Sequence, residues 1–403
     1  MIRGFGDSQA LIPHLRSAFN QAFTTARYQS FVAELERQCG GHVEFHLSET
    51  PCFVPRELMD RLVTGANTIV TQLLANAEYR RAADAIVPEA FRTPKGEDRP
   101  TFVQVDVGLV GAPQGIEARL VELQAFPSLY GFQVLLAETA QRQYGLEELT
   151  PFYGGISRDE YIRLVGRAIL GDHDPAEVVL LEIDPRHQKT WPDFVMTERM
   201  WGVRAVDLRE IERHGSRLFL KRDGRLSPVS RIYNRVIPDE LEKKGIAWPF
   251  TGDDDPDVEW AGGPDWFFRL SKYSIPWISH PWVPRTFYLD RLETLPEPRE
   301  AWLLKPLFSF AGGGIIFAPT DEQIAAIPRE ARRNFILQER VAFTPVIETP
   351  HGPTQVELRI MMIRDGARYR AVLPLGRMGR GKMMGVDHNK GLKWVGAAAV
   401  LIE

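Results

Sequence analysis

The segment FVQVDVGLV, residues 102–110, alternates apolar and polar side chains, a pattern typical of a β-strand with two unlike faces. Val103, Val105, Val107 and Leu109 share one face, and Gln104, Asp106 and Gly108 share the other. A turn region and a second run, ARLVELQAF at 118–126, come next, so we predict a β-hairpin with a longer loop. Such a hairpin brings Asp106 close to Glu122 and Gln124.

The segments around this hairpin predict a mixed α/β (α+β) chain. Apolar residues recur at helical spacing over 12–38 and 54–85, whereas strand and helix patterns alternate after 157. The final third contains further strand patterns, and the loop-like stretch 251–265 separates it from the α/β part. The predicted boundaries are an N-terminal helical layer over 1–100, the hairpin unit over 101–156, an α/β unit over 157–270 and a last unit over 271–403.

Composition narrows the functional class. An apolar fraction of 44% is too high for a disordered chain, and a net charge of −4 without a basic block argues against nucleic acid or a membrane surface as partner. Two cysteines, Cys39 and Cys52, exclude a disulfide scaffold or a thiolate zinc cluster. The apolar stretch 395–402 is too short to span a bilayer, and no leader pattern opens the chain. We therefore expect a soluble cytoplasmic enzyme.

A lysine on an apolar strand precedes three glycines in WLLKPLFSFAGGGIIF, residues 302–317. Backbone N–H groups of Gly312, Gly313 and Gly314 could approach phosphate oxygens, and Lys305 could reach the same anion. A plain hairpin turn is the alternative for the glycines alone. The lysine favours the phosphate interpretation, because burying an unpaired ammonium group is costly.

Two further sets of polar residues are candidates. Asp106, Glu122 and Gln124 offer the oxygen ligands that magnesium prefers, although a solvated hairpin face is an equally good interpretation. Glu357 and Arg359 share one face of the strand pattern 356–363, where they need each other or a charged ligand if they are buried. The glycine-rich stretch 376–391, with Arg377 and Asn389, is either a solvated loop or a clamp for polyphosphate.

Together these residues resemble the ATP-grasp superfamily. Lys305-Pro306 and the glycines match its nucleotide-covering segment, and Gln338-Glu339 with Val341 match its adenine-holding strand. Glu357-x-Arg359 and Arg377 with Asn389 follow in the expected order. The metal-binding residues of the family stand here before this segment, so the order resembles the circularly permuted ATP-grasp group that contains glutathionylspermidine synthase-like proteins.

The resemblance implies an ATP- and Mg²⁺-dependent carboxylate–amine ligase that acts through an acyl phosphate. Under it, 101–156 is the metal hairpin, 157–270 a domain that precedes the ATP-grasp segment, and 271–403 the nucleotide-binding segment. The implied ATP-binding residues are Lys272, Lys305, Gly312, Gly313, Gly314, Gln338, Glu339, Val341, Glu357 and Arg359. Asp106, Glu122 and Gln124 are the implied metal ligands, and Arg377 and Asn389 the implied catalytic residues.

The implied substrates are a small-molecule acid and an amine, of the amino-acid or peptide class. Ser128, Arg231 and Arg235 would select among them, since guanidinium groups suit carboxylates, although surface arginines beside a strand are as good an interpretation. Two other functions stay open: a small-molecule kinase that uses the same nucleotide site, and a nucleotide-binding module without catalysis.

Overall fold

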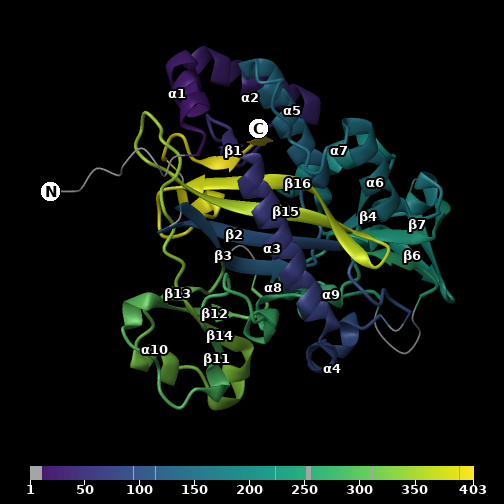
Figure 1. The fold of residues 1–403 in the computed structure, drawn as a ribbon. Coiled ribbons are helices and arrows are strands. Elements are labelled where there is room, and N and C mark those ends of the chain that lie inside the picture. The colour runs from purple at the N-terminus through teal and green to yellow at the C-terminus, as the bar shows by residue number, and fades with distance from the viewer. Residues whose placement is uncertain are drawn as a thin grey trace.

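The computed structural model describes residues 11–93, 95–113, 115–222, 224–250, 256–309, 312–389 and 391–403. They form a mixed α/β chain with several sheets, in which strands of the N-terminal third lie beside strands of the C-terminal third (Figure 1). Residues 251–255 of the predicted loop 251–265 lie outside the described parts.

The largest sheet has five antiparallel strands in the order β17-β16-β15-β2-β3. Its members are β2 (Phe102–Ala112), β3 (Gly115–Gln124), β15 (Gln355–Asp365), β16 (Arg368–Gly379) and β17 (Gly396–Ala398). The predicted hairpin is confirmed as β2 and β3, and β2 also pairs with β15 although about 250 residues separate them. This pairing makes one sheet of the units predicted as 101–156 and 271–403.

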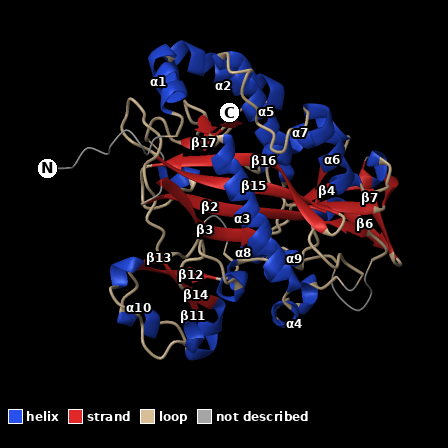
Figure 2. Cartoon of the chain, viewed as in Figure 1, coloured by secondary structure: helices blue, strands red, loops and turns tan. Residues whose placement is uncertain are grey.

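The apolar face of β2 forms the main core. Val103, Val105 and Val107 are fully buried and share a hydrophobic cluster with helix α3 (Arg56–Ala75), which crosses the sheet (Figure 2). A bulge between Asp106 and Val107 shifts the pairing with β3, so Leu120 and Leu123 both reach this core despite their odd spacing. The polar face of the hairpin is left for Asp106 and its neighbours.

Four further α-helices lie before residue 150 in the described part of the chain. They are α1 (Pro13–Ala22), α2 (Thr25–Cys39), α4 (Ala77–Ala85) and α5 (Tyr130–Tyr144). The short strand β1 (Cys52–Val54) pairs in parallel with β18 (Val400–Ile402), which joins the N-terminal layer to the C-terminal end. Cys39 and Cys52 are both buried free thiols.

The α/β part contains the parallel sheet that the alternating pattern predicted. Its order is β10-β9-β4-β5, with β4 (Val178–Glu182), β5 (Arg204–Asp207), β9 (Arg231–Asn234) and β10 (Glu259–Ala261). Helices α6 (Arg158–Leu170), α7 (Trp191–Trp201) and α8 (Pro238–Lys244) belong to it. A three-stranded meander, β6 (Ile211–His214), β7 (Arg217–Arg222) and β8 (Arg225–Val229), extends from this part.

A smaller antiparallel sheet lies below the five-stranded sheet in Figure 1. Its order is β11-β14-β12-β13, with β11 (Thr286–Tyr288), β12 (Trp302–Pro306), β13 (Ile316–Phe317) and β14 (Phe335–Glu339). Helices α9 (Trp266–Arg269) and α10 (Asp321–Ala325) and the 3₁₀ helix η5 (Lys272–Trp277) accompany it. In the described part of the chain, no helix has both the length and the apolar character to cross a bilayer.

Candidate active site

A cavity of about 350 Å³ is lined by residues of the five-stranded sheet and of the antiparallel sheet β11-β14-β12-β13. Most of the sequence-predicted site residues line it: Glu122, Gln124, Ser128, Lys272, Lys305, Gly312, Gln338, Val341, Glu357, Arg359 and Arg377. Arginine and lysine side chains outnumber carboxylates in this lining, so the cavity suits an anion.

Asp106 is the buried centre of the polar network. It lies opposite Arg359 in the β2–β15 register, and the Arg359 guanidinium donates from Nε and Nη2 to the two carboxylate oxygens, both at 2.7 Å. Arg377 donates to the same carboxylate. Burial alone would raise the pKa of Asp106, but the two arginines outweigh it and hold this pKa below its ordinary value. Asp106 is therefore an anion that orients two cations.

Arg377 also links β15 to β16. It lies opposite Glu357 in the strand register and donates to its carboxylate. Burial raises the pKa of Glu357. Gln124 reaches the same network, because its amide oxygen, when turned toward Arg359, accepts from Nη2 at 2.6 Å. Glu357 and Arg359 are thus both buried, and each pairs with a neighbouring strand instead of with the other.

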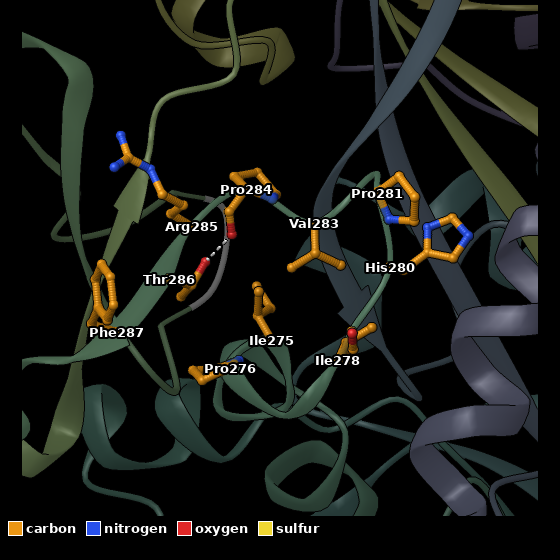
Figure 3. Close-up of a pocket in the computed structure, with 11 residues that line it drawn as sticks. Ile275, Pro276, Ile278, His280, Pro281, Val283, Pro284, Arg285, Thr286 and Phe287 are labelled. Atoms are coloured by element: carbon orange, nitrogen blue, oxygen red, sulfur yellow. Dashed lines mark hydrogen bonds between the residues drawn. The ribbon is translucent and has the colours of Figure 1, made fainter.

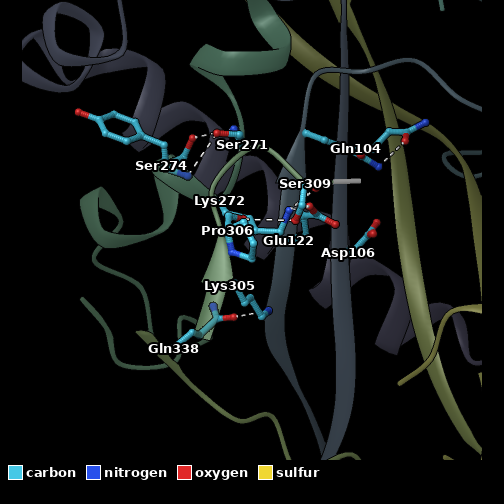
Figure 4. Close-up of polar contacts among 12 residues, drawn as sticks. Gln104, Asp106, Glu122, Ser271, Lys272, Ser274, Lys305, Pro306, Ser309 and Gln338 are labelled. Atoms are coloured by element: carbon cyan, nitrogen blue, oxygen red, sulfur yellow. Dashed lines mark hydrogen bonds and ion pairs between the residues drawn. The ribbon is translucent and has the colours of Figure 1, made fainter. Parts of the chain in front are cut away.

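Lys272 enters the cavity from the first residue of η5 (Figure 4). A capping box formed by Ser271 and Ser274 fixes the start of this short helix. The Lys272 ammonium group lies 3.1 Å from Glu122 Oε1 and donates to the carbonyl oxygen of Ser309 at 2.7 Å. An ion pair thus joins the two segments that the sequence predicts to bind a metal ion and a nucleotide.

Lys305 lies on β12, and its ammonium group donates to Gln338 Oε1 on the neighbouring strand at 2.5 Å (Figure 4). The side chain is 6% exposed, and burial lowers its pKa to about 8. Glu122 and Glu357 act against this shift, whereas Lys272 adds to it. A buried ammonium group beside a second lysine is well placed to bind a polyanion.

The glycine turn between β12 and β13 is held close to its neighbours. A Cβ atom at Gly312 would lie 2.5 Å from the Met383 side chain, and one at Gly314 would lie 2.8 Å from Pro306. Both glycines have positive φ, of 76° and 73°. Gly312 lines the cavity, whereas Gly313 and Gly314 are exposed and are not among its lining residues.

The depressed pKa of Lys305 makes anion binding depend on pH. Since the ammonium form attracts phosphates, we expect ATP affinity to fall as pH rises through about 8, approaching about tenfold per pH unit above it. Calorimetric titrations between about pH 6.5 and about pH 9.5 measure this slope. The Lys305→Met variant should lose it, and a flat wild-type profile would contradict the assignment.

Two of the predicted substrate residues lie away from the cavity. Arg231 pairs with Glu259 at 2.6 Å and donates to the carbonyl oxygens of Ile169 and Ala168. Arg235 is 1% exposed and pairs with Asp193 at 2.5 Å. Arg231 begins strand β9 and Arg235 directly follows it, so the two arginines hold helices α6 and α7 to the parallel sheet. Of the three predicted substrate residues, only Ser128 lines the cavity.

Asn389 and Glu339 also have other partners. The Asn389 amide accepts from the N–H groups of Arg380 and Gly381 and donates to the carbonyl oxygens of Met383 and Gly385. It therefore shapes the 380–385 loop, which itself lines the cavity, and does not reach in. Glu339, the last residue of β14, pairs with Arg285 at 3.2 Å and does not line the cavity. Its neighbours Gln338 and Arg340 do.

The carboxylates of the cavity fit a metal ion only if phosphate groups of a bound molecule supply further oxygen ligands. No group of three or more His, Cys, Asp and Glu side chains that could hold a metal ion occurs in the ranges that the structure describes. Both carboxylate oxygens of Asp106 accept hydrogen bonds from arginine. Among the carboxylates predicted from the sequence as site residues, Glu122 and Glu357 line the cavity. Mg²⁺ commonly takes one or two protein carboxylates together with phosphates, and this donor set fits that form of binding.

Several lining residues were absent from the predicted set. Phe45 comes from the N-terminal layer, and Leu129 and Phe132 from the start of α5. Arg340 and Lys382 add positive charge. Arg340 lies within the segment 338–341 that the resemblance assigns to adenine, and Lys382 lies within the glycine-rich stretch 376–391. No sequence signal separates Phe45 from the other aromatic residues of the N-terminal layer, because its place depends on tertiary packing.

A larger cavity of about 510 Å³ lies elsewhere (Figure 3). Its lining is drawn from one stretch of chain, between Ile275 and Phe287, with three prolines and few charged groups. Because functional sites gather polar groups from several elements, the smaller cavity is the better candidate.

Comparison with solved structures gives one informative neighbour. The chain resembles the apo form of a glutathione synthetase-like effector, GSS30, from Globodera pallida, with a TM-score of 0.54 and 11% identity. The match covers 92% of this chain and 97% of that one. No family model and no curated protein sequence matches the chain. At this identity the likeness establishes a shared overall fold, which is glutathione synthetase-like.

Proposed function

We propose that the protein is an ATP- and Mg²⁺-dependent carboxylate–amine ligase. The observation that carries the proposal is the convergence of Lys272 and Lys305 with Arg359 and Arg377 on one cavity that also contains Glu122. Phosphoryl transfer requires mainly positioning and charge neutralisation, which such a set supplies. The glutathione synthetase-like fold of the neighbour adds support for a ligase.

In this proposal ATP lies between the two sheets. Lys305 and Lys272 bind its phosphates, and the backbone at Gly312 covers them. The adenine takes the side of the cavity that Gln338 and Val341 line, together with Leu303 and Phe317. Aromatic and aliphatic walls suit a purine ring.

The proposed architecture is an ATP-grasp fold in circularly permuted order. The support is topological: the hairpin of β2 and β3 precedes the segment 271–403 in sequence, yet its strand β2 pairs with β15, which in turn pairs with β16, the strand of Arg377. Lys272 of the later segment also pairs with Glu122 of the earlier hairpin. A permuted chain requires such a junction between distant segments.

Mg²⁺ would bind between the phosphates and Glu122 and Glu357, with Gln124 as a further oxygen ligand. When bound, it would neutralise the charge of the outer phosphates. Asp106, which the sequence suggested as a ligand, instead positions Arg359 and Arg377. Glu122 and Glu357 pair with Lys272 and Arg377, so binding of Mg-ATP would rearrange these pairs.

The proposed reaction has two steps. A substrate carboxylate oxygen attacks the γ-phosphorus of ATP, so that an acyl phosphate forms and ADP leaves. The amine then attacks the acyl carbon, and inorganic phosphate leaves as the C–N bond forms. Arg377 lies beside the carboxylates at the centre of the cavity and would contact the transferring phosphoryl group.

The test of this proposal is product analysis. With Mg-ATP and a panel of amino acids and short peptides, the protein should form ADP and phosphate. Hydroxylamine should intercept the acyl phosphate and give a hydroxamate when the amine is absent. AMP and pyrophosphate as products would overturn the scheme. A phosphorylated product that resists hydroxylamine would favour a small-molecule kinase.

Glu122→Gln should abolish hydroxamate formation and leave most of the nucleotide affinity, since it removes a metal ligand far from the adenine end. Glu117→Gln is the matched control, because Glu117 lies on the same strand β3 but pairs with Arg119 on the surface. Hydroxamate colorimetry and nucleotide titration measure the two effects. Wild-type turnover in Glu122→Gln would contradict the assigned role.

One observation favours a nucleotide-binding module without catalysis as the second candidate. Asp106, Glu122 and Glu357 are each paired with a protein cation, so the network is neutralised without a metal ion. ATP binding that is indifferent to Mg²⁺, with no turnover across the acid panel, would establish this alternative over the ligase.

A further inference from the structure

One group of apolar residues in the cavity lining, which we call the apolar end, has no role in the proposed contacts with ATP and Mg²⁺. Its lining comes from four parts of the chain: Phe45, Leu129 and Phe132, Leu375, and Met384. The rings of Phe45 and Phe132 meet edge to face, with centroids 5.3 Å apart. Apolar lining therefore dominates this end, in contrast to the cationic centre.

Arg377 marks the boundary between the cationic centre and the apolar end. Leu375 and Arg377 lie two residues apart on β16, so their side chains share a face of the strand and are neighbours. A carboxylate bound at Arg377 would therefore have Leu375 beside it. The adenine end, with Phe317 and Val341, belongs to the other sheet.

The walls of the apolar end are held in place by buried polar contacts. Asp193 accepts from the N–H groups of Leu129, Gly131 and Phe132 at 2.9 to 3.1 Å. Leu129 has a positive φ of 66°, a conformation that these contacts help to maintain. On the opposite wall, Asn389 ties down the loop that carries Met384. A preformed apolar subsite lowers the cost of binding a matching side chain.

We propose that the acid substrate carries an apolar side chain, which binds among Phe45, Leu129, Phe132 and Met384. Its carboxylate then lies at Arg377, next to the ATP phosphates. This inference rests on the proposed ligase function and adds the substrate class. It also gives the N-terminal layer a role in selectivity, since Phe45 comes from the stretch between α2 and β1.

The experiment is calorimetric titration of the full chain with a non-hydrolysable ATP analogue, MgCl₂ and single amino acids. L-phenylalanine and L-leucine should bind at least about tenfold more tightly than L-aspartate and L-serine, because only the former bury apolar surface in the subsite. Phe45→Ala should weaken L-phenylalanine binding about fivefold or more and leave affinity for the analogue unchanged.

Phe219→Ala is the matched control, because Phe219 is a half-buried aromatic residue on β7 that packs on His214 and is absent from the cavity lining. It should change neither affinity. Met384→Gln is a second variant of the apolar end, in case Phe45→Ala fails to fold. It should weaken L-phenylalanine binding in the same way and leave affinity for the ATP analogue unchanged.

The outcomes separate the two proposals. If the ATP analogue does not bind the wild-type protein, the proposed nucleotide-dependent function falls. If the analogue binds but L-aspartate or L-serine binds as tightly as L-phenylalanine, or no amino acid of the panel binds, the inferred substrate class is overturned and the nucleotide site stands. Unchanged L-phenylalanine affinity in folded Phe45→Ala and Met384→Gln would equally overturn it.

Discussion

Lys305→Met should weaken ATP binding by about 2 to 4 kcal/mol, or roughly 30- to 1000-fold, as truncation of one partner in a buried charged contact does. The ammonium group is buried, is held by Gln338 and faces the cavity. Methionine retains the length of the side chain and fills the same apolar strand site. The variant should therefore fold, because the main counter-charge of Lys305 in this proposal is the ligand.

Lys382→Met is the control for the loss of one positive charge. Lys382 also lines the cavity but is exposed on the 380–385 loop. Its removal should lower ATP affinity less than about fivefold, since solvent screens exposed charges. Calorimetry at one salt concentration compares the two variants. If the two variants lose the same ATP affinity, the loss reflects the net charge of the cavity and not a specific contact of Lys305. Wild-type ATP affinity in Lys305→Met would show that Lys305 does not contact the nucleotide.

Asp193→Ala should lower the free energy of unfolding by about 3 to 5 kcal/mol, because it leaves Arg235 buried without its ion partner. The same carboxylate caps the first turn of α5 through three N–H groups. Urea denaturation followed by circular dichroism measures the change through its midpoint. Arg235, predicted from the sequence to select substrates, is thus expected to affect stability first.

Glu198→Ala is the matched control, since Glu198 lies on the same helix α7 and pairs with Arg204 at 3.0 Å on the surface. An exposed pair of this kind contributes below about 1 kcal/mol. Equal destabilisation by the two substitutions would show that the Asp193–Arg235 pair has no special weight in the fold.

Patterns with a short period predicted secondary structure well. The alternation of 102–110 became β2, and the strand patterns around Lys305 and Glu357 became β12 and β15. Each pattern records which side chains face the core, and that preference is local. The helical pattern over 12–38 became two helices, α1 and α2, because local periodicity does not report where a helix ends and another begins.

Pairing between distant strands decided which predicted site residues meet. Asp106 was predicted as a metal ligand because the hairpin brings it close to Glu122 and Gln124, but the β2–β15 register sets it opposite Arg359, which contacts both carboxylate oxygens. Arg235 and Asn389 had plausible spacing and chemistry, yet Asp193 and the 380–385 loop engage them. A sequence pattern gives the face of a residue and not its partner across the sheet.

The amino-acid sequence by itself determined the strands and helices, the apolar faces and the chemical character of the site, with its lysines, arginines and carboxylates. The physical reason is that burial preference and backbone conformation are set within a few residues. Only the tertiary structure decided that Phe45 joins Phe132 at the cavity, that Lys272 meets Glu122, and that β2 lies beside β15. These contacts form between segments far apart in the chain, and the interaction free energy of such a contact depends on both segments together.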